Sequence, residues 1–147
     1  MLGLPGLMKR KVLKCMVLGL TVLVAQEAAS HSIWDGVYTE QQAKRGKAQY
    51  DRQCADCHGE ELEGDAEAPP LSGGDFLWKW NGLTLEHLFD RVHRDMPMKK
   101  AGTLSREVTA ELLAYMLSVS KLPPGARELP RDSGALKEIR IDAARPK

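Results

Sequence analysis

Five consecutive residues, Cys54-Ala-Asp-Cys57-His58, place two thiols and an imidazole within one helical turn. Residues three apart on a helix share a face, so both thiols can meet the same partner while the adjacent imidazole approaches it from below. Two such thiols can add to the two vinyl groups of a haem, and the imidazole can then bind its iron. The C-x-x-C-H spacing therefore predicts one haem c attached through Cys54 and Cys57, with His58 as the proximal iron ligand.

A C-x-x-C pair has two other common uses. A redox-active dithiol of the thioredoxin type follows a strand in a βαβ pattern, and a four-ligand zinc site usually has a second pair of ligands elsewhere. The chain shows neither pattern, and its third cysteine, Cys15, lies far from the pair. The sequence therefore favours haem attachment over a dithiol or a zinc site.

The first 30 residues are typical of a secretory signal peptide. Four basic residues at positions 9–14 precede an apolar stretch at residues 15–25. The small residues Ala28-Ala29-Ser30 follow this stretch. We predict residues 1–30 as the signal peptide, a mature start at His31 and a periplasmic location. The alternative is an uncleaved membrane anchor, although the apolar stretch is short for a span. Cys15 precedes the apolar run, which is the wrong order for a lipoprotein acceptor, so it leaves with the signal.

The charge balance excludes one class of function. The 147 residues carry 21 Lys and Arg and 20 Asp and Glu; residues 1–30 hold four of the basic and one of the acidic residues, which leaves 17 against 19. A nucleic-acid binder would need a basic stripe, and none is present. The length fits one domain, and the low aromatic content implies a modest core that a buried haem would complete.

Three helices are expected to position the motif. Thr39 and Gln42 form a capping box for a first helix over residues 40–57, whose last turn would be the haem motif. A second helix is predicted at residues 85–94, capped by Thr84 and ended by the proline after Met96. A third is predicted at residues 105–119.

The first and third helices are expected to touch where Gly46 lets the ring of Tyr115 approach closely. Residues 59–82 are rich in Gly, Pro and acidic residues and are predicted to be a loop. Residues 125–147 are interpreted as a C-terminal arm with one short helix or strand, or alternatively as a disordered tail.

Residues 34–124 resemble a class I c-type cytochrome, with the C-x-x-C-H motif near the amino terminus and a Met-Pro pair well downstream. The runs Ile33-Trp-Asp-Gly-Val-Tyr-Thr39 and Trp78-Lys-Trp-Asn-Gly-Leu-Thr84 are similar to small periplasmic monohaem cytochromes found beside quinoprotein dehydrogenases. This resemblance implies an all-α cytochrome c fold: three main helices and long loops around one covalently attached haem. The cytochrome domain would be residues 31–124, followed by the arm.

The resemblance also implies residues around the haem. Family members hold the proximal histidine with a backbone carbonyl in a Pro-x-Leu segment, which Pro69-Pro-Leu71 matches, so Pro69 is the expected acceptor for His58. A family tryptophan in a Trp-Asn-Gly run packs on the haem and donates to a propionate. Trp80 fits that run better than Trp78, for which plain core packing is the alternative.

The sixth iron ligand is open at the sequence level. Met96 is the leading choice, because the family ligand directly precedes a proline. Met98 is the alternative, and His87, His93 or an open site remain. Lys99 and Lys100, just after Met96, either attract an acidic partner to the haem edge or are simply solvated.

These residues predict a one-electron carrier, not an enzyme, that passes electrons between a dehydrogenase and a terminal acceptor such as an oxidase or another cytochrome. The resemblance implies a quinoprotein dehydrogenase as the candidate donor. A variant of this hypothesis makes the chain an electron-accepting subunit of the dehydrogenase. No small-molecule substrate and no nucleic acid are expected as partners. The alternative is a gas-binding, sensor or peroxidase-type haem protein with a labile or open sixth position.

Overall fold

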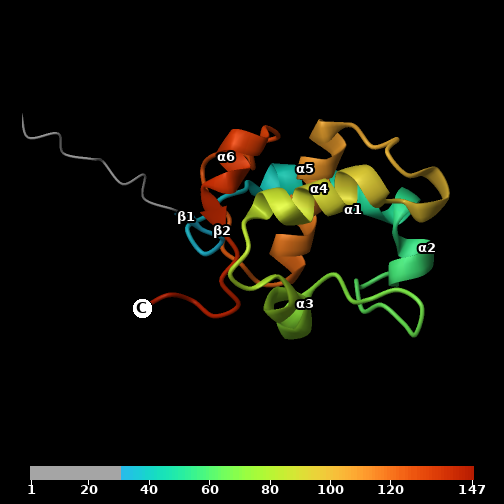
Figure 1. The fold of residues 1–147 in the computed structure, drawn as a ribbon, viewed down its shortest axis with the longest axis horizontal. Helices are drawn as coiled ribbons and strands as arrows, with labels where there is room; N and C mark the ends of the chain where they lie inside the picture. The colour runs from blue at the N-terminus through green and yellow to red at the C-terminus, as the bar shows by residue number, and fades with distance from the viewer. Residues whose placement is uncertain (1–30) are drawn as a thin grey trace, which may run out of the picture.

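The computed structural model describes residues 31–147 (Figure 1). The predicted signal peptide and Cys15 within it lie outside the described residues. Within the described part of the chain, no helix is both long and apolar enough to cross a membrane. The elements are, in chain order, β1 (His31–Ser32), α1 (Glu40–Gln53), α2 (Ala55–His58), α3 (Gly73–Trp80), α4 (Leu85–Asp95), the 3₁₀ helix η1 (Met98–Lys100), α5 (Arg106–Val119), α6 (Ser133–Lys137) and β2 (Ile139–Arg140).

Helices α1 and α5 pack together at a glycine. A Cβ atom at Gly46 would overlap the carbonyl group of Glu111 and would lie 2.9 Å from the Cβ of Tyr115, so only glycine fits without a shift. The predicted contact between Gly46 and Tyr115 is confirmed. This contact fixes how closely the helix that leads into the haem motif approaches α5.

Only one of the two hydrogen bonds of the predicted capping box forms at the start of α1. The Thr39 hydroxyl accepts a hydrogen bond from the Gln42 N–H at 3.1 Å, as an N-cap should. The second predicted bond, from the Thr39 N–H to the Gln42 side chain, is wrong, because the Gln42 amide bonds instead to the backbone of Leu129. A long-range tertiary contact has taken the side chain that a local rule assigned to the cap.

The first helix ends earlier than predicted. The expected helix over residues 40–57 stops at Gln53, and the chain bends at Cys54, where φ is −128° and ψ is −35°. The N–H groups of Cys57 and His58 both bond to the Cys54 carbonyl, at 3.1 and 2.9 Å, and begin a new helix, α2. The haem motif therefore forms a separate short helix at an angle to α1 (Figure 1), not the last turn of α1.

The predicted loop at residues 59–82 contains a helix, so that prediction is wrong in part. Helix α3 begins at Gly73, whose φ of +78° turns the chain into it, and buries Phe76 and Leu77. The glycine pair was taken as a barrier to regular structure, whereas Gly73 starts the helix. The tertiary burial of two apolar side chains supplies the stability that local propensity lacks.

The other two helices match their predictions to within one residue. Helix α4 ends at Asp95, with Met96 as its C-cap, and buries Leu85, Leu88, Phe89 and Val92. Helix α5 is capped by the Ser105 hydroxyl and is buried along most of its length. Together α1, α4 and α5 are the three main helices, and the fold is the mostly helical cytochrome c fold that was expected.

Residues 125–147 are folded against the body, and the alternative of a disordered tail is wrong. The arm holds both a short helix, α6, and a strand, β2, and Leu136, Ile139 and Ile141 are buried. Strand β2 pairs in parallel with β1, with His31 opposite Ile139. Figure 1 shows this small sheet and α6 at one end of the molecule and α2 at the other.

Candidate functional site

A mostly apolar cavity of about 610 Å³ lies between α2, α3, α4 and the loops that follow α2 and α4. The structure brings every predicted haem-contacting residue to its wall: Cys54, Cys57, His58, Pro69, Trp80, Met96 and the alternative Met98. Leu71, Phe76, Leu88, Val92 and Met116 are among its other apolar lining residues. Residues spread over more than 60 positions of the sequence thus surround one space.

The imidazole of His58 is buried and oriented by the backbone. Its Nδ1 lies 2.9 Å from the Pro69 carbonyl oxygen. His58 as a whole is 9% exposed to solvent. A carbonyl can only accept, so Nδ1 carries the proton and donates it, which leaves Nε2 with a free lone pair. This is the tautomer that binds a metal through Nε2, with the second nitrogen held by an outer partner.

The two cysteines of the motif are free thiols on one side of the cavity. Cys57 is exposed and Cys54 is half-buried. Burial, and to a lesser extent the neighbouring Cys57, raises the pKa of the Cys54 thiol to about 11, so the thiol is neutral at physiological pH. Among the described residues, no group of three or more His, Cys, Asp or Glu side chains is arranged to hold a metal ion.

A second hydrogen bond holds the chain just after the motif, and it involves a residue that the sequence prediction missed. The hydroxyl of Tyr50, which is buried in α1, donates to the Gly59 carbonyl at 2.6 Å. Burial, and secondarily the neighbouring Cys54, raises the pKa of Tyr50, so the phenol stays protonated and remains a donor. A tyrosine one helical turn before the first cysteine was the only sequence signal for this contact.

The two candidate thioethers occupy different positions on the cavity wall. Met96 directly follows α4, is half-buried and packs against the hydrophobic core. Met98 begins η1 and is 80% exposed. A thioether that reaches the interior of the cavity is therefore more readily supplied by Met96 than by Met98.

The two histidines of α4 point to other partners. His87 Nδ1 lies 3.0 Å from the Thr84 hydroxyl, and His93 Nδ1 lies 3.4 Å from the Thr109 hydroxyl. Neither histidine lines the cavity.

The two tryptophans of α3 have different environments. Trp80 lines the cavity and is partly buried, whereas Trp78 is 65% exposed and does not line it. The core-packing alternative for Trp78 is therefore wrong. Trp80 remains the predicted haem-contacting tryptophan, at the end of α3.

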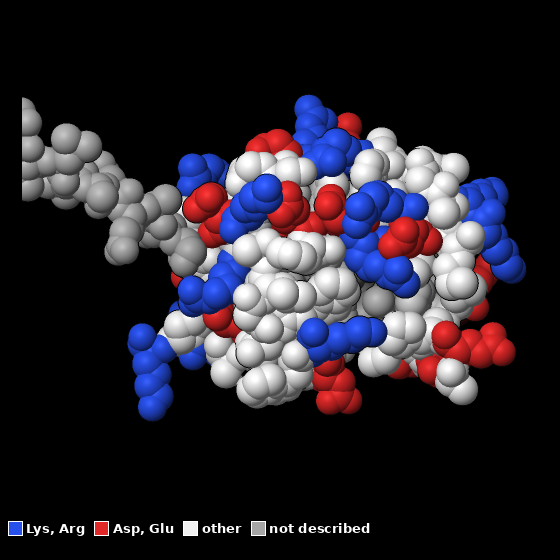
Figure 2. Space-filling view, viewed as in Figure 1, with Lys and Arg blue, Asp and Glu red and all other residues white. Residues whose placement is uncertain are grey.

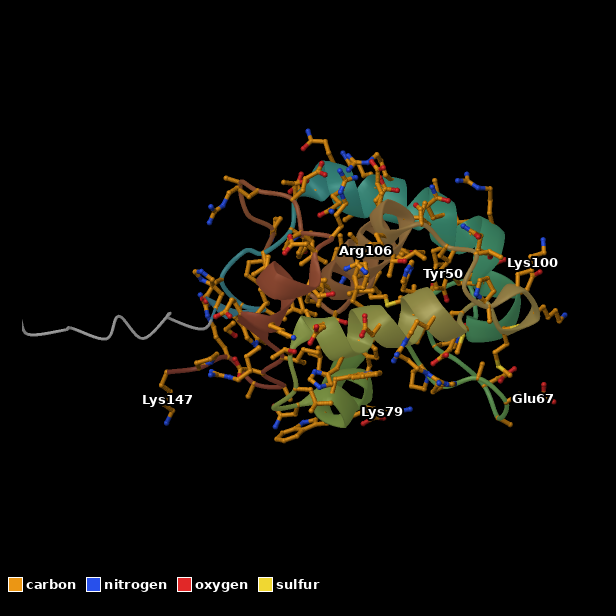
Figure 3. The ribbon with its side chains drawn as sticks, turned by 45° about the horizontal axis from the view of Figure 1, so that its top comes forward. Tyr50, Glu67, Lys79, Lys100, Arg106 and Lys147 are labelled. Atoms are coloured by element: carbon orange, nitrogen blue, oxygen red, sulfur yellow. The ribbon has the colours of Figure 1, made fainter. Side chains whose placement is uncertain are left out.

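Charged side chains of both signs line the cavity mouth. Lys79, Arg91 and Lys99 contribute positive charge, and Asp56, Asp65 and Glu67 contribute negative charge. In Figure 3 Lys79 reaches out from α3 and Glu67 from the loop before it, and in Figure 2 acidic side chains gather at the lower right edge of the face.

The roles of Lys79 and Arg91 were missed at the sequence level. Arg91 is paired with Asp95 at 2.8 Å, one turn along α4. The only sequence signals were that Lys79 lies between two tryptophans and that Arg91 precedes the buried Val92 by one position. Both can provide counter-charge to carboxylates at the edge of the cavity.

These features fit a covalently held haem. Two neighbouring thiols stand on one wall, and an imidazole nitrogen with a free lone pair stands beside them. A thioether lies on the cavity wall, the lining is mostly apolar, and the charged residues at the mouth include three cations and three anions. A flat, apolar macrocycle with an iron centre and two carboxylates needs these groups.

The comparison with protein families agrees with this chemistry. Residues 41–116, more than half of the chain, match the family described as cytochrome C oxidase, cbb3-type, subunit III. No curated protein matches the chain. Among solved structures, the sulfane dehydrogenase SoxCD from Paracoccus pantotrophus aligns with a TM-score of 0.48 and 23% identity, covering 86% of this chain and 68% of that chain. With the C-x-x-C-H motif inside the matched residues, the chain belongs to the cbb3-type subunit III family and is a class I c-type cytochrome, an electron-transfer protein with covalently bound haem c.

Proposed function

We propose that this protein is a periplasmic monohaem cytochrome that carries one electron at a time, with His58 and Met96 as the two side chains that would bind the haem iron. The observation that carries the proposal is the presence of both side chains on the wall of one apolar cavity. The bound haem supplies an iron centre that accepts and releases a single electron. The chain supplies the ligands, their orientation and the dry surroundings.

The His58 side of the site is built for a fixed geometry. The Pro69 carbonyl holds the imidazole proton on Nδ1 and prevents the ring from turning. The same hydrogen bond raises the basicity of Nε2, which strengthens a ligand bond to iron. A ring that cannot rotate costs little reorganisation when the charge of the site changes.

The Met96 side determines the kind of haem protein. A thioether favours ferrous iron and raises the reduction potential, and a filled sixth position keeps oxygen and peroxide from the metal. The partial burial of Met96 against the core supports this role. Outer-sphere electron transfer follows from such a site, whereas gas binding and peroxidase chemistry need an open or labile position.

We propose redox proteins as the partners: a dehydrogenase as donor, a quinoprotein dehydrogenase being our specific hypothesis, and an oxidase or another cytochrome as acceptor. The exposed Lys99 on the cavity mouth supports an acidic docking surface on one of them. Recovery of the cytochrome together with a dehydrogenase from solubilised cells would support the subunit variant, and recovery of the cytochrome alone would support the free carrier.

Absorption spectra of the holo-protein test the ligand assignment. The oxidised protein should show the weak far-red band typical of Fe–S(Met) bonding, and the reduced protein should not change on addition of carbon monoxide. Met96→Ala should abolish the band and allow carbon monoxide to bind. Met98→Ala is the matched control and should leave both properties unchanged.

The opposite pattern for the two methionine variants would move the ligand to Met98. Carbon monoxide binding by the unaltered protein would contradict the carrier and favour the gas-binding or peroxidase alternative.

The periplasmic location has its own test. Expression of the full chain in a bacterium with c-type maturation should yield holo-protein in the periplasmic fraction, with His31 as the first residue by amino-terminal sequencing. Retention in the membrane fraction with residues 1–30 intact would support the anchor instead.

A further inference from the structure

We propose that the C-terminal arm, residues 125–147, holds the Trp80 wall of the haem cavity in place, with Asn81 as the positioning residue that joins the two. The inference rests on the proposed contact between Trp80 and haem. It assigns the arm, which lies beyond residues 41–116 of the family match, a role at the redox site.

Three hydrogen bonds connect the arm to the turn that follows Trp80. The Gly82 N–H donates to the Ile141 carbonyl, and the Ile141 N–H donates to the Leu83 carbonyl, each at 2.8 Å. The Ala143 N–H donates to Oδ1 of Asn81, also at 2.8 Å. The backbone and the one polar side chain of this turn are therefore held by residues 141–143.

The turn itself is directly coupled to Trp80. The Leu83 N–H donates to the Trp80 carbonyl at 3.1 Å, and the Asn81 N–H donates to the Trp78 carbonyl at 3.3 Å. The side chain of Leu83 is 39% exposed, and a Cβ at Gly82 would meet nothing within 4 Å. The turn has little packing of its own, so the arm supplies most of what fixes it.

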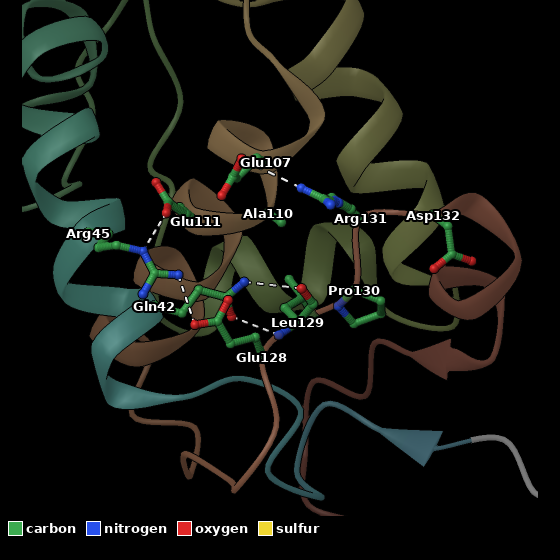
Figure 4. A pocket seen from close by; sticks show the side chains of 10 residues that line it. All are labelled: Gln42, Arg45, Glu107, Ala110, Glu111, Glu128, Leu129, Pro130, Arg131 and Asp132. Carbon is green, nitrogen blue, oxygen red and sulfur yellow. Dashed lines mark hydrogen bonds and ion pairs between the residues drawn. The ribbon is translucent and has the colours of Figure 1, made fainter.

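The arm can hold the turn only if the arm is itself fixed, and it is fixed at its other end. The Gln42 amide of α1 bonds to both backbone groups of Leu129: its Nε2 donates to the Leu129 carbonyl at 3.1 Å, and the Leu129 N–H donates to its Oε1 at 2.7 Å (Figure 4). Both residues are buried, so these bonds are shielded from water.

Two further contacts fix the middle and the end of the arm. Arg106 of α5 lies over the Phe89 ring at 4.6 Å and donates from Nε to the Arg131 carbonyl at 2.6 Å. Near the end, the Trp34 indole N–H donates to the Asp142 carbonyl at 2.9 Å. The arm thus connects α1, α5 and the segment after β1 to the end of α3.

A loosened turn should alter the haem site in a specific way. If Asn81 and residues 141–143 release the end of α3, Trp80 moves and water enters the cavity beside it. Greater solvent exposure favours the more highly charged oxidised site, so the reduction potential falls. The overall fold need not be lost, because α1, α4 and α5 keep their own contacts.

The experiment compares Asn81→Ala with Asn81→Asp in the holo-protein. Asn81→Ala removes the acceptor for Ala143, and Asn81→Asp keeps an oxygen acceptor at the same place. The first readout is amide hydrogen exchange at Ala143 and Gly82 by NMR. The second is Soret circular dichroism, which reports how aromatic side chains sit around haem and is less sensitive to an added charge than a potential is.

We expect Asn81→Ala to speed exchange at both amides by roughly fivefold, the equivalent of one hydrogen bond, to change the Soret dichroism and to lower the reduction potential. Asn81→Asp should restore slow exchange and the wild-type dichroism. Lys147→Ala, at the exposed end of the chain, is the matched control and should change nothing.

Unchanged exchange and dichroism in Asn81→Ala would overturn the proposal, as would a failure of Asn81→Asp to restore them. These outcomes are distinct from failure of the proposed function, which would appear as an open sixth position in the spectrum of the unaltered protein. A chain that ends at Arg140 removes all three bonds and should enlarge the effects of Asn81→Ala that it can still report, namely exchange at the Gly82 amide, Soret dichroism and reduction potential. A wild-type dichroism in that shortened chain would also count against the arm.

Discussion

The two walls of the haem cavity are built in different ways. The wall that carries His58 is local: the two cysteines, the imidazole and its partner Pro69 lie within 16 consecutive residues, and its hydrogen bonds span short distances along the chain. The other wall, with Trp80 and Met96, comes from α3 and the end of α4, and the turn after Trp80 is joined to residues 141–143. A local wall can be predicted from a motif, whereas a wall assembled at long range depends on the whole fold.

The largest expected effect removes the haem from between the two walls. In a Cys54→Ala, Cys57→Ala double variant expressed without covalent attachment, the cavity of about 610 Å³ is left without its filling. We expect the apo-chain to lose its cooperative thermal transition and most of its helical circular dichroism. A cooperative melt with native helicity would show that both walls form without the cofactor.

A second test removes the indole of the long-range wall. Trp80→Ala should lower the free energy of unfolding of the holo-protein by about 2–3 kcal/mol, somewhat less than a fully buried tryptophan, because Trp80 is only partly buried. Denaturant unfolding followed by Soret absorbance measures the change.

Trp78→Ala is the matched control, since Trp78 is 65% exposed on the same helix. It should change stability by about 0.5 kcal/mol or less. Equal losses in the two variants would mean that α3 itself, not the indole of Trp80, is what the wall requires.

A third test weakens the local wall. Tyr50→Phe removes the donor to the Gly59 carbonyl and should cost about 1 kcal/mol in the same unfolding experiment. Tyr115→Phe is the control, because within residues 31–147 its hydroxyl makes no hydrogen bond while its ring packs against Tyr50. If both substitutions cost the same, the hydrogen bond after the motif contributes nothing beyond packing.

The smallest expected effect is a pH dependence of the arm. Hydrogen bonds from Arg140 hold the pKa of Asp142 below its usual range, so this carboxylate stabilises the folded arm at neutral pH. Because the folded pKa is the lower one, the contribution is complete above about pH 4 and is lost as the pH falls through the folded value. Thermal melts between neutral pH and acid should show a steeper acid loss for the wild type than for Asp142→Asn.

The sequence predicted the local wall well and the remote one only in part. The spacing of Cys54, Cys57 and His58 and the Pro-x-Leu segment pointed to residues that meet in space. The bend at Cys54 and the helix beginning at Gly73 were missed, because both depend on which groups are buried by distant parts of the chain. Rules based on local helix propensity predict that a helix ends at glycine and continues through good helix formers, and they take no account of tertiary contacts.

The arm illustrates the same limit. Its apolar residues indicated that some of it packs on the body, but neither its partner nor its function was visible. Gln42 is a reasonable capping-box residue by local rules, yet its amide bonds to Leu129, 87 positions away. Such a choice is made by the geometry of the assembled fold, since a buried amide must find partners wherever they are.

The sequence by itself determined the chemistry: two thiols and an imidazole at a spacing that attaches haem, and helices with apolar faces to surround it. Only the tertiary structure decided which tryptophan lines the cavity, which methionine is sheltered and what supports the wall that carries Trp80. The physical reason is range. Bond-forming chemistry needs a few neighbouring residues, whereas burial and hydrogen-bond partners depend on segments that meet only after the chain has folded.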